Sequence, residues 1–213
     1  MIRIKHFIGW LLLAALLPVA CKKQSYASRD TSGLKPAPVV PPPAVDTTSI
    51  SFNTADTLDN WETAGNKGSI EKPGAKEGQG WLKAAIVNGE DYMHFIYRRP
   101  AAVNSGLTKN NGALHLWFYI GDLSQLKNDG QFELTSSGES DKNEYAWNLG
   151  PMLPNLKNGW NELVLHFSDA AESSGDGGPN LTAFNFFRLY LWSTGKSHPD
   201  LALGVDDLRL FKK

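Results

Sequence analysis

Two segments of the chain alternate strictly between apolar side chains and larger, partly polar ones. Between 187 and 192 the apolar row is Phe187, Leu189 and Leu191, and the other row is Arg188, Tyr190 and Trp192. Between 113 and 120 the apolar row is Leu114, Leu116, Phe118 and Ile120, and the other row is His115, Trp117 and Tyr119. A period of two predicts a β-strand with one face in a core. Because an outward-facing row is normally short and polar, the rings in the second rows need an explanation.

From Ser49 to the end, the chain consists of short runs of alternating apolar and polar residues, separated by clusters of Gly, Asn, Asp and Pro. We predict strands near Ile50–Asn53, Gly68–Glu71, Trp81–Val87, Tyr92–Tyr97, Ala113–Ile120, Gln131–Ser136, Tyr145–Asn148, Asn161–Phe167, Asn185–Trp192 and Leu203–Phe211. One helical turn is expected at Leu123–Lys127. The fold class is therefore all-β, an antiparallel β-sandwich over residues 48–213. Its core is expected to hold Leu114, Leu116, Phe118, Leu163, Leu165, Phe167, Phe187, Leu189, Leu191, Val205, Leu208 and Leu210.

The first 20 residues have the pattern of a signal peptide. A basic start is followed by the apolar run Ile8–Leu17, which is shorter than the roughly 20 residues of a membrane span. The sequence Leu17-Pro18-Val19-Ala20-Cys21 resembles the lipobox of bacterial lipoproteins. The resemblance implies cleavage before Cys21 and acylation of that residue, palmitate included. It also implies a lipid anchor, with the outer membrane as the expected location, on either its periplasmic face or the cell surface.

Residues 21–47 are predicted to be a tether that begins at the lipidated cysteine. The segment Lys35–Pro43 is rich in proline, and such segments favour an extended polyproline II conformation. Cys21 is the single cysteine of the 213 residues, so no disulfide can form within the chain. A formal net charge of -1 with mixed signs leaves no basic stripe, which argues against nucleic acid as a partner.

Three pieces of the domain, in order, resemble the galactose-binding-like β-sandwich of many carbohydrate-binding modules. They are the strand Ile50–Asn53 followed by Glu77–Ala84, the W-x-x-L-x-L strand Gly159–Phe167, and the ending Leu203–Phe211 with its Asp206-Asp207 pair. The resemblance implies a jelly roll of two antiparallel sheets. It does not fix a function, because this fold hosts binding modules, accessory domains and structural spacers.

The two aromatic rows predict one hydrated aromatic surface, provided that their strands share a sheet. Sugars stack their C–H faces on rings and bind donors and acceptors at the ring edges. We therefore expect a non-catalytic carbohydrate-binding site formed by His115, Trp117, Tyr119, Arg188, Tyr190 and Trp192, which the alternating pairs Tyr92/His94 and Tyr145/Trp147 extend. The alternative is a structural or assembly subunit that docks another protein through the same surface.

An enzyme that cleaves glycans is a third reading, and the sequence gives it little support. The segment Glu139–Glu144 fits the pattern E-x-D-x-x-E of one group of retaining β-glucanases. In that family the intervening positions are largely apolar, whereas here they are Ser, Lys and Asn, as in a charged turn. Outside the signal peptide, the histidines lie on separate segments without metal-ligand spacing, at His94, His115, His166 and His198. We therefore assign no catalytic residue.

Calcium is the one metal that the resemblance to these modules implies. Many of them hold a structural calcium between the first and last strands, and Asp206 and Asp207 occupy the matching end of this chain. The first strand offers Asn53 where an acidic residue is common. The alternative is that one of the two aspartates caps a bulge with local hydrogen bonds.

Overall fold

The structure is a computed structural model that describes residues 49–64, 68–173 and 177–213. The predicted signal peptide, Cys21 and the tether lie outside the described residues. Among the residues described, none belongs to a helix with the length and apolar character that crossing a bilayer would require.

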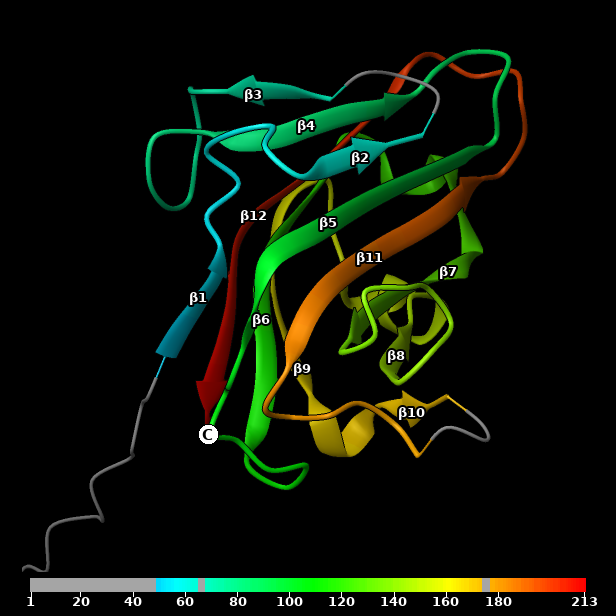
Figure 1. The fold of residues 1–213 in the computed structure, drawn as a ribbon. Helices are drawn as coiled ribbons and strands as arrows, with labels where there is room; N and C mark the ends of the chain where they lie inside the picture. The colour runs from blue at the N-terminus through cyan, green and yellow to red at the C-terminus, as the bar shows by residue number, and fades with distance from the viewer. Residues whose placement is uncertain (1–48, 65–67, 174–176) are drawn as a thin grey trace, which may run out of the picture. The chain divides into compact units, whose positions relative to one another are not determined.

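The described chain is built from strands joined by short turns (Figure 1). The strands are β1 (Ser49–Asn53), β2 (Trp61–Thr63), β3 (Ser69–Glu71), β4 (Trp81–Ile86), β5 (Tyr92–Val103), β6 (Gly112–Ile120), β7 (Leu126–Thr135), β8 (Glu144–Asn148), β9 (Gly159–His166), β10 (Ala171–Glu172), β11 (Phe184–Ser193) and β12 (Leu201–Lys212). Three 3-10 helices are η1 (Leu123–Gln125), η2 (Gly150–Asn155) and η3 (Phe167–Asp169). The turn expected at Leu123–Lys127 is thus confirmed as η1. The sequence pattern missed β2 and β10, which at three and two residues are too short to show alternation.

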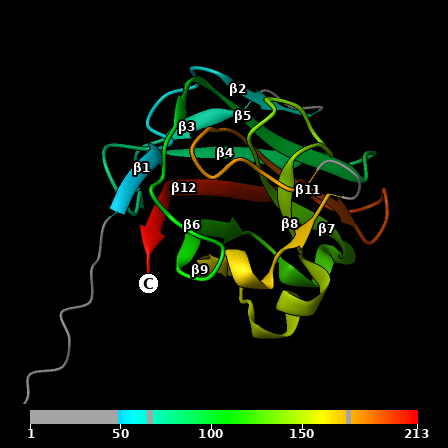
Figure 2. The same ribbon diagram turned by 60° about the horizontal axis from the view of Figure 1, so that its bottom comes forward.

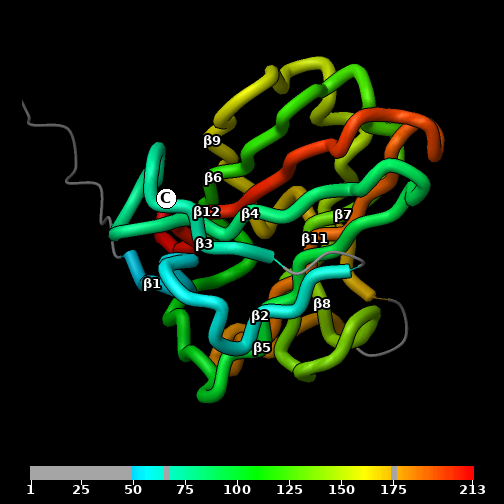
Figure 3. Tube along the Cα trace, turned by 90° about the horizontal axis from the view of Figure 1, so that it is seen from above, coloured from blue at the N-terminus to red at the C-terminus, as the bar shows by residue number. Residues whose placement is uncertain are grey.

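The strands form two antiparallel sheets. Sheet A has the order β3-β4-β12-β6-β9, with β1 also paired to β12 (Figure 2). Seen from above, β9, β6, β12, β4 and β3 of sheet A follow one another in Figure 3. Sheet B has the order β10-β8-β7-β11-β5-β2 (Figure 1). Every strand pair within them is antiparallel. The predicted all-β sandwich is therefore confirmed.

The core lies between the inner faces of the two sheets. All the side chains that alternation assigned to the core are buried, and most are fully inaccessible. Phe118 of sheet A meets Phe132 of sheet B edge to face, with ring centroids 5.6 Å apart. Full burial of a side chain of this size stabilises the fold by about 1.5–3 kcal/mol. Repetition of such contacts along each strand is what holds the two sheets together.

The topology corrects the prediction of one joined aromatic surface. β6 lies in sheet A and β11 lies in sheet B, so the row of Trp117 and the row of Trp192 are on the outer faces of different sheets. Tyr145 and Trp147 do not extend either row, because both are buried in the core, with 3% and 4% of their surface exposed. Alternation separates the two faces of a strand, but it does not say which strands lie beside one another.

Candidate functional site

The outer face of sheet B brings polar and aromatic side chains from four adjacent strands into register. Tyr190 of β11 lies opposite His94 of β5 on one side and Gln131 of β7 on the other. Gln131 in turn lies opposite Asn148 of β8. Such directly opposed residues have Cβ atoms about 4.5–5.5 Å apart. The result is a continuous cross-strand row that mixes rings with amides.

One end of the sheet-B outer face is formed mainly by aromatic side chains of β5 and β11. Trp192 and its cross-strand neighbour Tyr92 have ring centroids 5.2 Å apart. Tyr190 meets Trp192 edge to face at 5.4 Å, and Tyr92 meets His94 at 5.7 Å. All four side chains are half-buried, so each keeps part of its ring open to solvent. We call these four residues the sheet-B aromatic cluster.

Hydrogen bonds fix the polar groups beside these rings. The Tyr190 hydroxyl donates to Gln131 Oε1 at 2.6 Å, and Gln131 Nε2 donates to Asn148 Oδ1 at 2.8 Å. Arg188 donates from Nε and Nη2 to both oxygens of Glu133, at 2.7 and 2.6 Å, and its guanidinium carbon lies 4.5 Å from the centre of the Tyr190 ring. Bidentate contacts of this kind hold a guanidinium in one orientation. The side chains of this face are therefore ordered before any ligand arrives.

Burial tunes the ionisable groups of the face. It raises the pKa of Tyr190 to about 12, with a further contribution from the Glu133 charge, and it also raises the pKa of Tyr92. Both phenols therefore remain hydrogen-bond donors at neutral pH. Burial lowers the pKa of His94 despite Glu62, whose Oε1 is 3.4 Å from His94 Nε2. His94 is therefore mainly neutral at pH 7.

The outer face of sheet A also carries rings, and a loop is packed against them. Trp81, Tyr119 and Trp160 lie 5.0–5.4 Å from one another. The segment between β3 and β4, residues 72–80, covers part of this cluster: Trp81 Nε1 donates to Pro73 O, and Lys76 Nζ lies 4.8 Å from the Trp117 ring. These rings are therefore engaged in holding residues 72–80.

His115, the third residue of the predicted β6 row, is also engaged in structural contacts. Its Nε2 lies 3.1 Å from Glu162 Oε1 on β9, and its Nδ1 lies 3.3 Å from the main-chain oxygen of Asp207. Of the six predicted ligand-binding residues, sheet B thus brings together Arg188, Tyr190 and Trp192. The structure places His115, Trp117 and Tyr119 on the other sheet, where their contacts are to the protein itself.

Asp206 and Asp207 accept hydrogen bonds from N–H groups. Asp206 Oδ2 accepts from the backbone of Lys76 at 2.6 Å and of Glu77 at 3.2 Å. Asp207 has a positive φ of 49° at a bulge in β12 and accepts from Arg209 Nε. Asn53 Oδ1 accepts from Ala55 N and Trp61 Nε1. Asp206 Oδ1, by contrast, is buried and has no hydrogen-bond partner in the described structure. The contacts of Asp207 at the bulge match the bulge-capping alternative, and the calcium stays a prediction.

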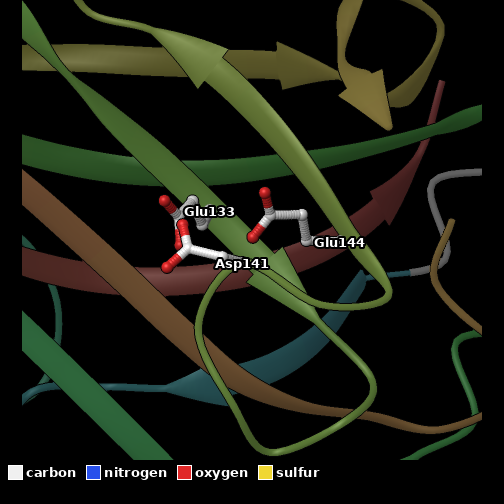
Figure 4. A group of neighbouring side chains, drawn as sticks. All are labelled: Glu133, Asp141 and Glu144. Atoms are coloured by element: carbon white, nitrogen blue, oxygen red, sulfur yellow. The ribbon is translucent and has the colours of Figure 1, made fainter. Parts of the chain in front are cut away.

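The acidic segment Glu139–Glu144 forms a turn with two unlike ends. Glu139 is exposed and pairs with Lys142, as a charged turn predicts. Asp141 and Glu144, however, converge with Glu133 of β7, and an oxygen of each lies within 4.8 Å of the others (Figure 4). Arg188 Nη2 donates to Asp141 Oδ1 at 2.6 Å, so this group borders the sheet-B face. Glu133 could not be predicted as part of this group, because a single acidic residue within a strand carries no recognisable pattern.

A groove of about 800 Å³ runs along β9 and η2, on the free edge of sheet A. Trp160, Met152 and Val164 contribute apolar surface, and Lys157 and Glu162 line it with charges. Val164 is one of the large apolar side chains left exposed in the described chain, at 44%. Asn148 of the sheet-B row also lines this groove, so the groove adjoins the amide end of the sheet-B face.

The fold matches solved structures of carbohydrate-binding proteins at low sequence identity. A family 11 carbohydrate-binding module of the cellulase Lic26A-Cel5E from Clostridium thermocellum superposes with a TM-score of 0.50 and 14% identity, over 78% of this chain and 95% of the module. The solution structure of CtCBM11 gives 0.52 and 13%, over 80% and 98%. The domain has their fold. An exo-β-agarase matches at 0.51 and 10%, over 79% of this chain but 25% of the enzyme. No protein-family profile and no curated protein matches the sequence.

Proposed function

We propose that this protein binds carbohydrate without cleaving it, through the outer face of sheet B. The observation that carries the proposal is the sheet-B aromatic cluster, which lies directly beside a fixed polar network. Half-buried rings offer flat surfaces to the C–H faces of sugars, and the amides and the guanidinium at their edges match hydroxyl groups. Because hydrogen bonds already orient these groups, a ligand loses less entropy on binding than it would at a mobile surface.

Each residue of the site has a distinct role in this proposal. Trp192 and Tyr190 are the stacking platforms, and Tyr92 enlarges them. Arg188 and Asn148 supply donors to sugar hydroxyls, while the half-buried His94 ring adds to the aromatic surface beside Tyr92. The likeness to the family 11 module supports the fold in which such a face is displayed, and the choice of residues rests on the geometry of this chain.

A catalytic role has no comparable support. The two carboxyl groups of a retaining glycosidase act on opposite sides of one bond and are about 5–5.5 Å apart. In the described chain both oxygens of the buried Glu133 accept hydrogen bonds from Arg188, so this carboxylate is already engaged within the protein. We therefore keep Glu133, Asp141 and Glu144 as supporting residues of the binding face.

The experiment that tests the function is a glycan array. We suggest the chain with Cys21→Ser, which removes the proposed acylation site and leaves the described residues unchanged. Binding of one or more glycans is expected, competed by the same free oligosaccharide. If the wild-type surface binds no glycan, the carbohydrate proposal fails, and a subunit that docks another protein takes its place.

We further propose that the domain is held at the outer membrane by acylation of Cys21. The support is the lipobox-like sequence that ends at Cys21 and the proline-rich segment that follows it. In this arrangement the tether gives the binding face access to glycans away from the membrane surface.

A further inference from the structure

Three carboxyl groups converge at the border of the sheet-B face, and two of them bind one guanidinium. Glu133 is completely buried and Glu144 is 7% exposed, whereas the Asp141 side chain is 72% exposed. Figure 4 shows the three side chains pointing toward one another from β7, β8 and the turn between these strands. Arg188 is the positively charged side chain that bonds Glu133 and Asp141. If all three carboxyl groups were ionised, the cluster would carry two uncompensated negative charges.

The contacts of Glu144 argue against this fully ionised state. Its Oε2 is buried and has no hydrogen-bond donor in the described structure. A buried carboxylate oxygen without a donor is costly, and a second buried carboxylate nearby raises the cost further. A proton on Oε2 removes both difficulties, because the resulting hydroxyl can donate to Glu133. Glu133 is the ionised partner, since both of its oxygens accept from Arg188.

We propose that Glu133 and Glu144 share one proton, which Glu144 carries and donates to Glu133, and that this proton keeps Arg188 oriented for the glycan. The second half of this inference rests on the proposed function, and the first half does not. Loss of the proton places two buried negative charges side by side on β7 and β8. The most exposed member of the cluster, Asp141, then moves away first, and Arg188 loses one of its two acidic partners.

The pKa values of the cluster and of its neighbours are consistent with a proton shared by Glu133 and Glu144 at neutral pH. Burial raises the pKa of Glu133 to about 7 and also raises the pKa of Glu144, with the Asp141 charge as a further cause. The other charged or titratable groups that face the cluster are Arg188 and Tyr190 on β11, Tyr92 and His94 on β5, and Glu62 on β2. The two tyrosines stay neutral, and the lowered pKa of His94 keeps it mainly neutral above pH 6.5.

The first arm of the test needs no glycan. Carbon-13 NMR of labelled glutamate side chains, in the full chain with Cys21→Ser, should show a carboxyl titration with a midpoint near 7. Glu144→Gln keeps a hydrogen-bond donor and should abolish this titration. Glu139→Gln, in the same turn but exposed, should leave it in place. The wild-type titration decides the matter even if Glu144→Gln fails to fold, because midpoints near the ordinary value for every glutamate would refute the shared proton.

The second arm measures the affinity for a glycan selected by the array. Between pH 6.5 and 8.5 the wild-type dissociation constant should rise on the order of tenfold, because only the protonated fraction is competent. Glu144→Gln should bind equally well at both pH values. A wild-type affinity that does not change with pH would overturn the link to Arg188. If no glycan binds at all, the proposed function fails, and the NMR arm still decides the shared proton.

A divalent cation is the competing occupant of the cluster. Calcium at millimolar concentration and pH 8.5 should leave the glutamate carboxyl signals of the wild type unchanged. A calcium-induced shift that disappears in Glu144→Gln would show that the cluster takes a metal ion in place of the proton, and would overturn the proposal.

Discussion

At the scale of single residues, Trp192 and Trp117 form a matched pair of large rings on different sheets. Trp192 belongs to the sheet-B aromatic cluster, whereas Trp117 lies under Lys76 on sheet A. Trp192→Ala should weaken glycan binding roughly tenfold, because ring stacking is worth about 1–2 kcal/mol. Trp117→Ala should lower the melting temperature and leave the affinity unchanged. Isothermal titration and thermal melts of both variants check this, and a reversed pattern would place the site on sheet A.

The metal question is also decided by single residues. Asp206 Oδ2, Asp207 Oδ1 and Asn53 Oδ1 accept from N–H donors, and of these residues' described contacts only Asp206 Oδ1 is a buried oxygen without a partner. Because one open oxygen is too few for a calcium site, we expect the same melting temperature in millimolar calcium and in chelator. A calcium site would require several of these oxygens to point toward one cation rather than toward N–H groups. An increase in melting temperature with calcium, lost in Asp207→Asn, would restore the calcium site that the family resemblance implies.

At the scale of elements, the segment 72–80 is attached to β12 through one carboxylate. Asp206 is fully buried and binds the amides of Lys76 and Glu77. Its neighbour Gly204 gives room to the Trp81 ring, since a Cβ there would overlap the ring. The segment thus depends on a short stretch of β12 for both its hydrogen bonds and its packing.

Asp206→Ala should destabilise the domain by about 2–3 kcal/mol, because two backbone donors lose a charged acceptor. Hydrogen exchange should accelerate at the amides of Lys76 and Glu77. Chemical denaturation and amide exchange measure the two effects, with exposed Asp59→Asn as the control. Unchanged exchange at these amides would mean that residues 72–80 are held by the rings alone.

At the scale of the whole molecule, buried carboxyl groups make stability depend on pH. Burial raises the pKa of Glu133 to about 7 and of Asp206 to about 6, from ordinary values of 4.5 and 3.8. Between the ordinary and the raised pKa the folded state holds protons that the unfolded state releases. The contribution of these two groups to stability is therefore fully present below their ordinary pKa, falls as pH rises, and is lost above about 7. Each such proton is worth up to about 1.4 kcal/mol per pH unit.

The free energy of unfolding should therefore be lower at pH 8 than at pH 5.5, by about 1–3 kcal/mol. Urea denaturation at the two pH values measures this difference. Glu144→Gln should reduce it, because one titrating group of the coupled cluster is removed. A stability that rises over this range would show that lowered pKa values elsewhere outweigh these buried acids.

The placement of the whole chain is tested through its single cysteine. Cys21→Ser should move the protein from the membrane fraction to the soluble fraction, because the proposed lipid anchor is lost. Fractionation followed by immunoblotting checks the outcome. Membrane association that survives the substitution would count against acylation at Cys21.

Alternation along the chain was enough to predict the longer strands and, for most of them, which side chains face the core. Alternation is a local property of extended backbone, so Leu189 and Phe118 could be assigned to the core, and Tyr190 and Trp192 to an outer face. The residues that join them at the site, such as Gln131 and Asn148, carry no pattern of their own and could not be predicted.

Which rows share a face depends on strand pairing, and the pairing is visible only in the folded domain. β6 and β11 have the same alternation, and pairing with distant strands places them in different sheets. The register of β7 and β8 places Glu144 diagonally across from Glu133, because Thr135 is opposite Glu144 and Ala146 is opposite Glu133. The fold also brings Lys76 to Asp206, 130 positions away. Such contacts join residues that are far apart in the sequence, and they form only when both sheets pack together. A local pattern carries no information about them. A period of two therefore fixes the face of a residue, while its neighbours on that face are set by the fold.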